Sequence, residues 1–335
     1  MNAKLLIKTW IGKSLITFCN CVRPSRSFLK RWGLRTSKEW FGDRLVRVCG
    51  REGSSFKLSH VSQNYLSFEL FWRGLEYYEP ISIRLVQELV QPGQVFLDVG
   101  ANIGFFTLAL TAVHSALRVV AFEPNPKNFG ILRRNIEINH LKEVTCERYA
   151  LSDFNGKAML YLSPSDMSAS LEADFQEEHA GGMEVSVMTL DDYLASRGLD
   201  GKLLIKVDVE GHEEAFFRGA ERTLTLRGPD VITEVTTPFA ESTLSLLRRA
   251  GYAFYSITDE GLTPAADVRT VIRGRYVFLN FLLSVRPWKE LTVVSKRLKA
   301  AANGLDLAQT SKLMHPALVK KLADRTVGHC ASIMS

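Results

Sequence analysis

The sequence lacks several features that would assign it to a class of protein at once. It has no internal repeat, no low-complexity tract and no proline-rich linker, and its composition is neither collagenous nor disordered. Near its start an apolar stretch is interrupted by Lys8 and Lys13, and no A-x-A cleavage site follows. A transmembrane helix needs about twenty uninterrupted apolar residues. We therefore predict neither a membrane-spanning helix nor a secretory signal there.

Cysteine is scarce, and its spacing fits neither a disulfide framework nor a metal site. The count is odd, no C-x-x-C pair occurs, and no histidine stands at a metal-ligand spacing from a cysteine. A scattered, odd set favours a reducing compartment, so we expect a cytoplasmic protein. The five residues are Cys19, Cys21, Cys49, Cys146 and Cys330.

Length and net charge limit the domain organisation and the partners that the chain can have. A chain of 335 residues, 46% of them hydrophobic, forms one large domain with extensions or two modest ones. The net charge is +6, and the excess of Lys and Arg lies toward the two ends. We expect the basic segments 1–40 and 287–335 to contact a membrane or an acidic partner, unless they are packed or solvated helices. Between them we expect a hairpin and a helix that cover the cleft (41–90) and a core domain (91–286).

The stretch from Val95 to Thr107 carries the most informative pattern. Val95–Leu97 is a short apolar run that predicts a strand buried on both faces, and Asp98 follows it. A turn with Gly100 and Gly104 comes next, and the apolar segment after the turn predicts a packed helix. Such a turn lets the backbone approach a ligand and directs the N–H groups of the new helix toward it. The pattern predicts a site for a nucleotide-like molecule.

The details of this turn indicate which nucleotide. The G-x-G-x-x-G fingerprint of dinucleotide sites is missing, and there is no Walker lysine. An acid before the turn suits a ligand with a positive amine and no phosphates, which favours S-adenosylmethionine over NAD or ATP. The next strand ends in an acid that can accept hydrogen bonds from both ribose hydroxyls. The expected cofactor site comprises Asp98, Gly100, Ala101, Asn102, Gly104 and Glu123.

Four motifs and one tract follow one another in the chain: WRGLEYYEP (72–80), DVGANIGFFT (98–107), AFEPNP (121–126), ALSD (150–153) and IKVDVEGHEEAFFRGA (205–220). Together they resemble the FkbM-type S-adenosylmethionine-dependent methyltransferases, over roughly Val46 to Arg286. The resemblance implies an α/β fold of the class I, Rossmann-like kind, with a doubly wound, mostly parallel sheet and a terminal antiparallel strand pair. It also implies S-adenosyl-L-methionine as cofactor. The implied reaction is O-methylation of a sugar, glycan or glycolipid hydroxyl, or of a secondary metabolite.

The same resemblance implies further site residues. Ser152 and Asp153, at the end of a third strand over residues 144–151, are expected beside the adenine, although Asp153 also suits a turn. Glu76, Tyr78 and Glu79 are expected to line the cleft and contact the substrate. Aromatic and acidic side chains so close together equally suit packing against the helix that follows.

Residues outside the motifs give a coarser picture. Alternation from Leu45 to Leu58 predicts a β-hairpin. The polar stretch Ser163–Met183 predicts a long loop that shapes the substrate pocket. Two final strands, 252–258 and 275–285, form the expected antiparallel pair, and the second carries Asn280.

A second chemical centre follows Leu203. Lys206, Asp208 and Glu210 alternate, so they lie on one face of a buried strand, where charge is costly without partners or a function. Methyl transfer to a hydroxyl needs in-line positioning and a base. Asp208, Glu210 and His212 are the candidate bases, and Lys206 pairs with an acid or orients the acceptor. His212 equally suits a structural role.

Glu234 ends the strand that follows this centre and is a candidate for substrate binding. Together with Asp208 and Glu210 it offers the hard oxygen ligands that Mg²⁺ prefers. Three carboxylates dispersed in the sequence are weak evidence for a metal. We therefore predict no metal site.

Two alternatives to this enzyme stay open. A nucleic-acid methyltransferase is disfavoured, because the turn at Asp208–Gly211 lacks the Asn/Asp-Pro-Pro-aromatic sequence that grips an exocyclic amine. No basic stripe interleaved with aromatic residues borders the cleft either, so nucleic acid is not an expected partner. The other alternative is a catalytically silent scaffold that acts through its basic termini. The partner we expect is a small-molecule or glycan hydroxyl acceptor.

Overall fold

The structure is a computed structural model. It describes residues 45–50, 54–61, 64, 66–67, 70–71, 74–75, 78–162, 169–173, 181–235, 239–268, 271–273, 276–278 and 280–303. The basic segment 1–40, Glu76 and the chain after Asn303 lie outside the described residues, so the expectations placed on them stay predictions. Within those ranges, no helix is long and apolar enough to cross a membrane.

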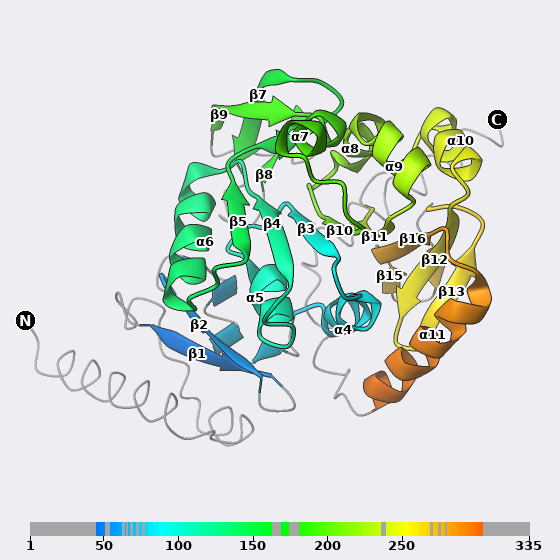
Figure 1. Cartoon of the computed structure of the whole chain (residues 1–335), viewed down its shortest axis with the longest axis horizontal. Helices are drawn as coiled ribbons and strands as arrows, with labels where there is room; N and C mark the ends of the chain where they lie inside the picture. The colour runs from blue at the N-terminus through cyan, green and yellow to red at the C-terminus, as the bar shows by residue number, and fades with distance from the viewer. Residues whose placement is uncertain are drawn as a thin grey trace, which may run out of the picture.

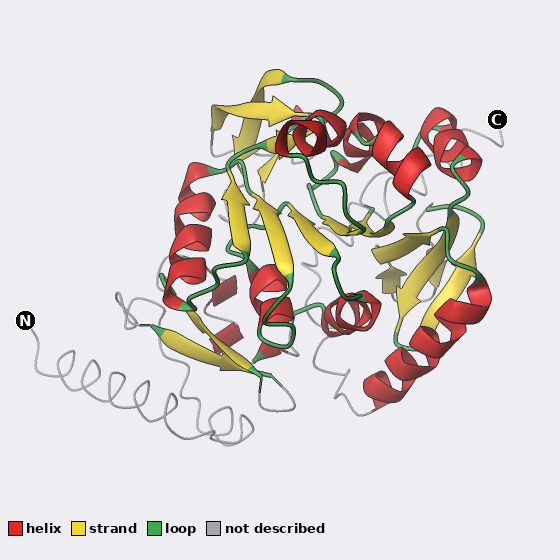
Figure 2. Ribbon diagram, viewed as in Figure 1, coloured by secondary structure: helices red, strands yellow, loops and turns green. Residues whose placement is uncertain are grey.

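An eight-stranded sheet forms the centre of the molecule (Figure 2). Its five parallel strands are β3, β4, β5, β10 and β11. Strand β16 runs antiparallel to both of its neighbours, β11 and β12. The predicted fold class is confirmed, with β13 as an additional edge strand. In spatial order the strands are β13 (Gly261–Ala265), β12 (Ala253–Thr258), β16 (Asn280–Ser284), β11 (Asp230–Glu234), β10 (Leu203–Val207), β3 (Val95–Val99), β4 (Arg118–Phe122) and β5 (Val144–Glu147).

Helices cover both faces of this sheet (Figure 1). Alternate residues of the same strand enter different cores: Phe96 belongs to one hydrophobic cluster, and Val95 and Leu97 belong to the other. The sheet is therefore doubly wound, as predicted. One face packs against α4 (Pro80–Leu89), α5 (Phe105–Thr111), α6 (Pro126–Ile138) and α11 (Trp288–Asn303), and the other against α7 (Leu190–Arg197), α8 (Glu213–Gly219), α9 (Glu221–Arg227) and α10 (Glu241–Arg249).

A second sheet of four strands contains β6 (Ala150–Leu151), β7 (Gly156–Leu162), β8 (Ala169–Ser170) and β9 (Gly182–Met188). The prediction of one third strand over residues 144–151 is wrong, because β5 ends at Glu147 and Ala150 pairs with Val187 of β9. The sequence has no breaker between the two pieces, so strand pairing decides where the chain leaves the main sheet.

The predicted strand 275–285 is also divided. Its first part, β15 (Tyr276–Phe278), pairs with β14 (Val271–Arg273) in a separate two-stranded sheet. Its second part, β16, joins the main sheet between β11 and β12. The expected antiparallel pair therefore consists of β12 and β16.

The predicted hairpin is present as β1 (Val46–Cys49) and β2 (Ser55–Leu58), which pair in antiparallel register. It packs against α5 and α6. The backbone N–H and the hydroxyl of Ser59 both donate to Oδ1 of Asn135 at 2.8 Å, and Nδ2 of Asn135 donates to the carbonyl of Ile103 at 2.9 Å. A buried amide therefore links the hairpin to the glycine turn.

Candidate functional site

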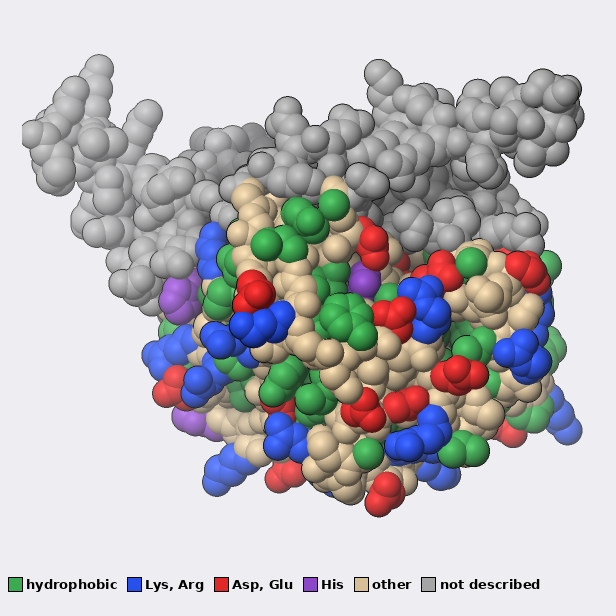
Figure 3. All heavy atoms as spheres, turned by 90° about the horizontal axis from the view of Figure 1, so that it is seen from above, with side chains coloured by type: hydrophobic (Ala, Val, Ile, Leu, Met, Phe, Trp, Pro, Cys, Tyr) green, Lys and Arg blue, Asp and Glu red, His purple; other side chains and the backbone are tan. Residues whose placement is uncertain are grey.

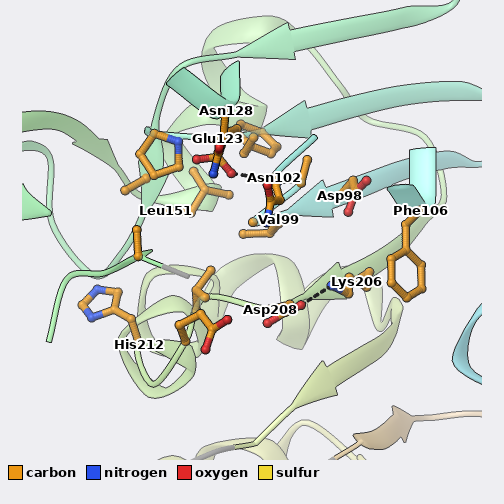
Figure 4. Close-up of a pocket in the computed structure, with 18 of the residues that line it drawn as sticks. Asp98, Val99, Asn102, Phe106, Glu123, Asn128, Leu151, Lys206, Asp208 and His212 are labelled. Atoms are coloured by element: carbon orange, nitrogen blue, oxygen red, sulfur yellow. Dashed lines mark hydrogen bonds and ion pairs between the residues drawn. The ribbon is translucent and has the colours of Figure 1, made fainter. Parts of the chain in front are cut away.

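A pocket of about 900 Å³, including space open to solvent at its mouth, lies at the carboxyl ends of β3, β4 and β10. The chain order of the strands reverses between β3 and β10, and open α/β sheets bind ligands at such a point. In Figure 4, Asp98, Asn102 and Glu123 lie on one side of the pocket, and Asp208 and His212 lie on the other. The two sides of the pocket differ in construction.

One side, which we call the glycine wall, consists of residues 98–104 and Glu123. Gly100 has φ +80°, and a Cβ on it would lie 1.8 Å from the carbonyl oxygen of Asp208. The N–H groups of Gly100 and Ala101 donate to the last carbonyl of β4, at 3.1 and 2.8 Å. Glycine is therefore required because two turns of the protein touch. The close approach of a ligand that the sequence suggested stays a prediction.

Asp98 and Gly104 fix the helix after the turn. Asp98 is 1% exposed, and its Oδ2 accepts hydrogen bonds from the N–H and the hydroxyl of Thr107, at 3.1 and 2.6 Å. Its buried Oδ1 has no hydrogen-bond partner in the described part of the chain. Burial raises the pKa of Asp98, although Lys206 opposes this effect. Gly104 has φ +88°, and a Cβ on it would meet Leu132. One oxygen of Asp98 is thus held by the helix, and the other is a buried acceptor without a partner among the described residues.

Glu123 lies 5% exposed in the pocket lining. Its Oε2 accepts a hydrogen bond from the N–H of Asn102, and its Oε1 accepts one from the N–H of Asn125, both at 2.8 Å. Asn102 has φ +50°, a left-handed conformation. Burial raises the pKa of Glu123 to about 7, although the two N–H groups oppose it. A carboxylate accepts about four hydrogen bonds, so Glu123 can still receive two hydroxyls.

The opposite side is lined by Tyr78, Lys206, Asp208 and Glu210. We call these residues the acidic wall, together with Glu79 and Glu234, whose carboxylates lie next to Asp208 outside the pocket lining. Nζ of Lys206 lies 2.7 Å from Oδ2 of Asp208 and 4.4 Å from the centre of the Phe106 ring. Burial acts against the charge of Lys206, but Asp208 and Glu79 outweigh it and raise the pKa of the ammonium. Tyr78 lines the pocket and packs edge-on against Phe105 of α5 at 5.3 Å, whereas the substrate contact expected of it stays a prediction.

Three carboxylates of this wall converge. One oxygen from each of Glu79, Asp208 and Glu234 lies within 4.8 Å of the others. Burial raises the pKa of Glu79 to about 7 and the pKa values of Glu210 and Glu234 well above their usual range. The strand that was expected to carry Asp208 and Glu210 ends earlier, at Val207. Both residues lie in the following turn, where Glu210 has φ +54°.

His212 lines the pocket but has both ring nitrogens occupied. Nδ1 lies 2.6 Å from Oε1 of Glu172, and Nε2 lies 2.8 Å from Oγ of Ser152. Ser152 is buried outside the pocket lining, and Asp153 is paired with Arg218 at 2.9 Å. The adenine contact expected of Ser152 and Asp153 therefore stays a prediction.

The sequence missed several residues that line the pocket: Phe106, Asn128, Tyr149, Leu151 and Leu171. Phe106 and Leu151 lie within the recognised motifs, and Asn128 lies just after one, so the motifs were the signal that could have identified these three. Phe106, Tyr149, Leu151 and Leu171 were passed over because apolar and aromatic side chains in such positions look like ordinary core residues.

The sheet order and the glycine wall define the class I methyltransferase fold. Residues 98–254 match the model of the "Methyltransferase FkbM domain". This match supports the FkbM-type methyltransferase family for this part of the chain.

Curated relatives support this assignment. The chain is 31% identical over 177 residues to "31-O-demethyl-FK506 methyltransferase FkbM" of Streptomyces tacrolimicus, covering 44% of this chain and 66% of the relative. It is 32% identical over 142 residues to "Hexuronic acid methyltransferase AglP" of Haloferax volcanii (42% and 56%). It is 28% identical over 156 residues to "2-O-methyltransferase NoeI" of Sinorhizobium fredii (42% and 63%). The chain thus spans less than two thirds of the length of each of these relatives.

Among solved structures, a methyltransferase FkbM from Methylobacillus flagellatus KT is similar at 18% identity, with 67% of this chain and 54% of that chain covered and a TM-score of 0.39. An O-methyltransferase from Bacillus cereus in complex with SAH is similar at 16% identity, with 62% and 82% covered and a TM-score of 0.35. The support for the FkbM-type family comes from the sequence matches.

Proposed function

We propose that the protein is an S-adenosylmethionine-dependent O-methyltransferase that acts on a hydroxyl of a sugar, glycan or glycolipid, or of a secondary metabolite. One observation carries the proposal. The glycine wall and the acidic wall meet in one pocket, with the Gly100 turn against the carbonyl of Asp208. A nucleotide-like methyl donor and an acceptor beside carboxylates would therefore be neighbours.

The glycine wall suits S-adenosylmethionine in its chemistry. Glu123 offers free lone pairs for two ribose hydroxyls, and Oδ1 of Asp98 is a buried acceptor without a hydrogen-bond partner among the described residues, which suits an ammonium group. Leu151 and Tyr149 add apolar surface for a base. The bound cofactor supplies an electrophilic methyl group. The residues of the chain hold it in place and exclude water.

The acidic wall suits an acceptor that must lose a proton. Methyl transfer gains most from in-line positioning, and a hydroxyl acceptor also needs a proton acceptor. Asp208 lines the pocket as a carboxylate paired with Lys206, and Glu79 lies beside it. His212 has both ring nitrogens occupied, which favours a positioning role. The names of the relatives, with hexuronic acid, 2-O- and 31-O- positions, support the O-directed reaction.

A nucleic-acid substrate gains no support from the surface. On the face in Figure 3, Lys and Arg side chains of the described residues are mixed with Asp and Glu, and no basic stripe crosses it. Recognition of a nucleic-acid backbone would use such a stripe. We keep a hydroxyl acceptor as the proposed partner, and contact of the basic termini with a membrane or an acidic partner as a separate proposal.

Calorimetric titration with S-adenosylmethionine and S-adenosylhomocysteine tests the proposal. We expect micromolar binding by the wild-type protein and at least about a tenfold loss in Glu123→Ala and Asp98→Ala, because each removes a charged acceptor. Glu137→Ala, a change of the same residue type at a side chain that is 71% exposed, should bind normally. If the folded wild-type protein binds neither ligand, the proposal fails and the scaffold alternative takes its place.

A further inference from the structure

The carboxylates of Glu79, Asp208 and Glu234 come from three separate elements. Glu79 is the N-cap of α4, Asp208 begins the turn after β10, and Glu234 ends β11. β10 and β11 are parallel neighbours, so Asp208 and Glu234 both lie at the carboxyl edge of the sheet, and α4 begins beside them. The oxygens lie within 4.8 Å of one another. Carboxylates repel at such distances, so this convergence needs a compensating positive charge or bound protons.

Lys206 supplies part of that charge. Its Nζ binds Oδ2 of Asp208 at 2.7 Å, and the lysine side chain is 5% exposed. Glu79, Glu210 and Glu234 interact with Lys206 as well as with Asp208, so within the described part of the chain the ammonium of Lys206 faces four carboxyl groups. Buried charges of one sign are costly unless they are paired or bind a metal.

Two buried oxygens at this end of the sheet have no hydrogen-bond partner among the described residues: Oε2 of Glu79 and Oδ1 of Asp98. Asp98 is 1% exposed, lines the pocket and stands opposite Lys206 in the β3–β10 register, so its side chain lies on the face of Lys206. An ionised carboxylate only accepts hydrogen bonds, so the missing partners are donors or cations: the ammonium group of the proposed cofactor for Asp98, and a cation for Glu79. Glu79 also offers one of the three converging oxygens.

We propose that Glu79, Asp208 and Glu234 bind a divalent cation that prefers oxygen ligands, such as Mg²⁺. Hard cations of this kind are held by carboxylates, amide oxygens and water, and the three groups include no His or Cys that would select zinc or copper. Asp208 can keep Lys206 on Oδ2 and still offer Oδ1. The sequence grouped Asp208 and Glu234 with Glu210, whereas the structure puts Glu79 in that place.

Asn280 is a candidate fourth ligand. It stands directly opposite Glu234 in the antiparallel β11–β16 register, and side chains of opposite residues lie on the same face. A cation held here would leave positions for water or for neighbouring hydroxyls of an acceptor, close to the lining residue Asp208. This last role rests on the proposed function, but binding of the cation does not.

Titration of Mn²⁺ followed by electron paramagnetic resonance tests the site on the full chain after treatment with a chelator. We expect one Mn²⁺ per chain, displaced by Mg²⁺, and at least about a tenfold weaker affinity in Glu79→Gln and in Glu234→Gln. Gln removes buried negative charge at nearly constant shape, so both variants should fold, and melting curves verify this. Glu137→Gln, on an exposed part of α6, should bind Mn²⁺ like the wild type.

Two results would overturn the cation site. One is a folded wild-type protein that binds no Mn²⁺ at millimolar concentration. The other is Mn²⁺ binding that Glu79→Gln and Glu234→Gln leave unchanged, since the ion then lies elsewhere. Calorimetry with S-adenosylmethionine on the same sample separates this question from the proposed function. A protein that binds Mn²⁺ but not S-adenosylmethionine supports the cation site and overturns the methyltransferase. A protein that binds S-adenosylmethionine but not Mn²⁺ supports the methyltransferase and overturns the cation site.

Discussion

The two walls of the pocket hold their carboxylates in different ways. In the glycine wall, Asp98 and Glu123 accept hydrogen bonds from backbone N–H groups of Thr107, Asn102 and Asn125. These donors belong to fixed turns and cost little to organise. Such a wall keeps its shape without a ligand.

In the acidic wall the carboxylates have mostly one another as neighbours. Asp208 is paired with Lys206, while carboxylate oxygens of Glu79 and Glu234 lie within 4.8 Å of it. Burial raises the pKa values of Glu79 and Glu234, because the positive charge of Lys206 offsets only part of the cost of removing water from their carboxylates. The comparison indicates that the glycine wall is preorganised for its ligand, whereas the acidic wall gains stability when a cation or proton arrives.

We expect the largest loss of stability and of cofactor binding for Gly100→Ala, which disrupts the contact between the two walls. The new Cβ would lie 1.8 Å from the carbonyl oxygen of Asp208, at φ +80°. We expect a loss of about 3 kcal/mol or more in the free energy of unfolding. Binding of S-adenosylmethionine should weaken at least about a hundredfold. Denaturant unfolding and calorimetry measure the two effects.

Gly93→Ala is the matched control for this change. Gly93 has a similar φ of +75°, but a Cβ there meets nothing within 4 Å. It should cost about 1 kcal/mol, from backbone strain alone. Equal losses in the two variants would show that the contact between Gly100 and Asp208 does not hold the walls together.

Lys206→Met should have the next largest effect, because it leaves Asp208 buried without its partner. We expect a loss of about 3 kcal/mol at pH 8. The loss should shrink at pH 5, where neighbouring carboxyls bind protons. Lys206→Met combined with Asp208→Asn should recover much of it in the same urea unfolding experiment. A double variant as unstable as the single one would mean that Lys206 stabilises the fold through Phe106 and the other carboxyls of the acidic wall, and not through Asp208.

The stability of the protein without cofactor or cation should fall as the pH rises from 5 to 8. The pKa values of Glu79, Glu123 and Glu213 are each raised to about 7, mainly by burial. A group with a raised folded pKa stabilises the fold below its unfolded pKa, and this contribution is lost as the pH rises through the folded pKa. We expect a decrease of roughly 1–3 kcal/mol in urea unfolding. Stability that increases over this range would contradict the picture of poorly compensated carboxyls.

The smallest effect is expected at His212. Ser152→Ala removes the hydroxyl bound to Nε2 in a buried site and should cost about 1 kcal/mol. Glu172→Gln, at a side chain that is 52% exposed, should cost less than about 0.5 kcal/mol. Thermal unfolding of both variants measures these losses. A larger loss in Glu172→Gln than in Ser152→Ala would make the Glu172 contact the main support of the ring.

The two walls also differ in how far the sequence predicted them. Asp98, Gly100 and Glu123 could be placed because each follows a short buried strand, and the carboxyl ends of parallel strands share one edge. Asp208 was named because it alternates with Lys206 and Glu210 on an expected strand, although that strand ends earlier, at Val207. The sequence did not show that Gly100 faces the backbone of Asp208, because that contact depends on how two distant turns pack.

The acidic wall could only be predicted in part. Glu79, Asp208 and Glu234 were each named as site residues, but their convergence depends on the position of α4 against the ends of β10 and β11. Asp153 was expected in the cleft because it follows a strand, yet that strand belongs to the second sheet and the side chain pairs with Arg218. Local patterns do not reveal which sheet a short strand joins.

A crystal structure of the full chain with S-adenosylhomocysteine is the most direct test of the central claim that the glycine wall binds the cofactor. We predict the ribose hydroxyls on Glu123, the amino group toward Oδ1 of Asp98, and the sulfur facing Asp208 across the pocket. Ligand density elsewhere, or a ribose that makes no contact with Glu123, would contradict the claim.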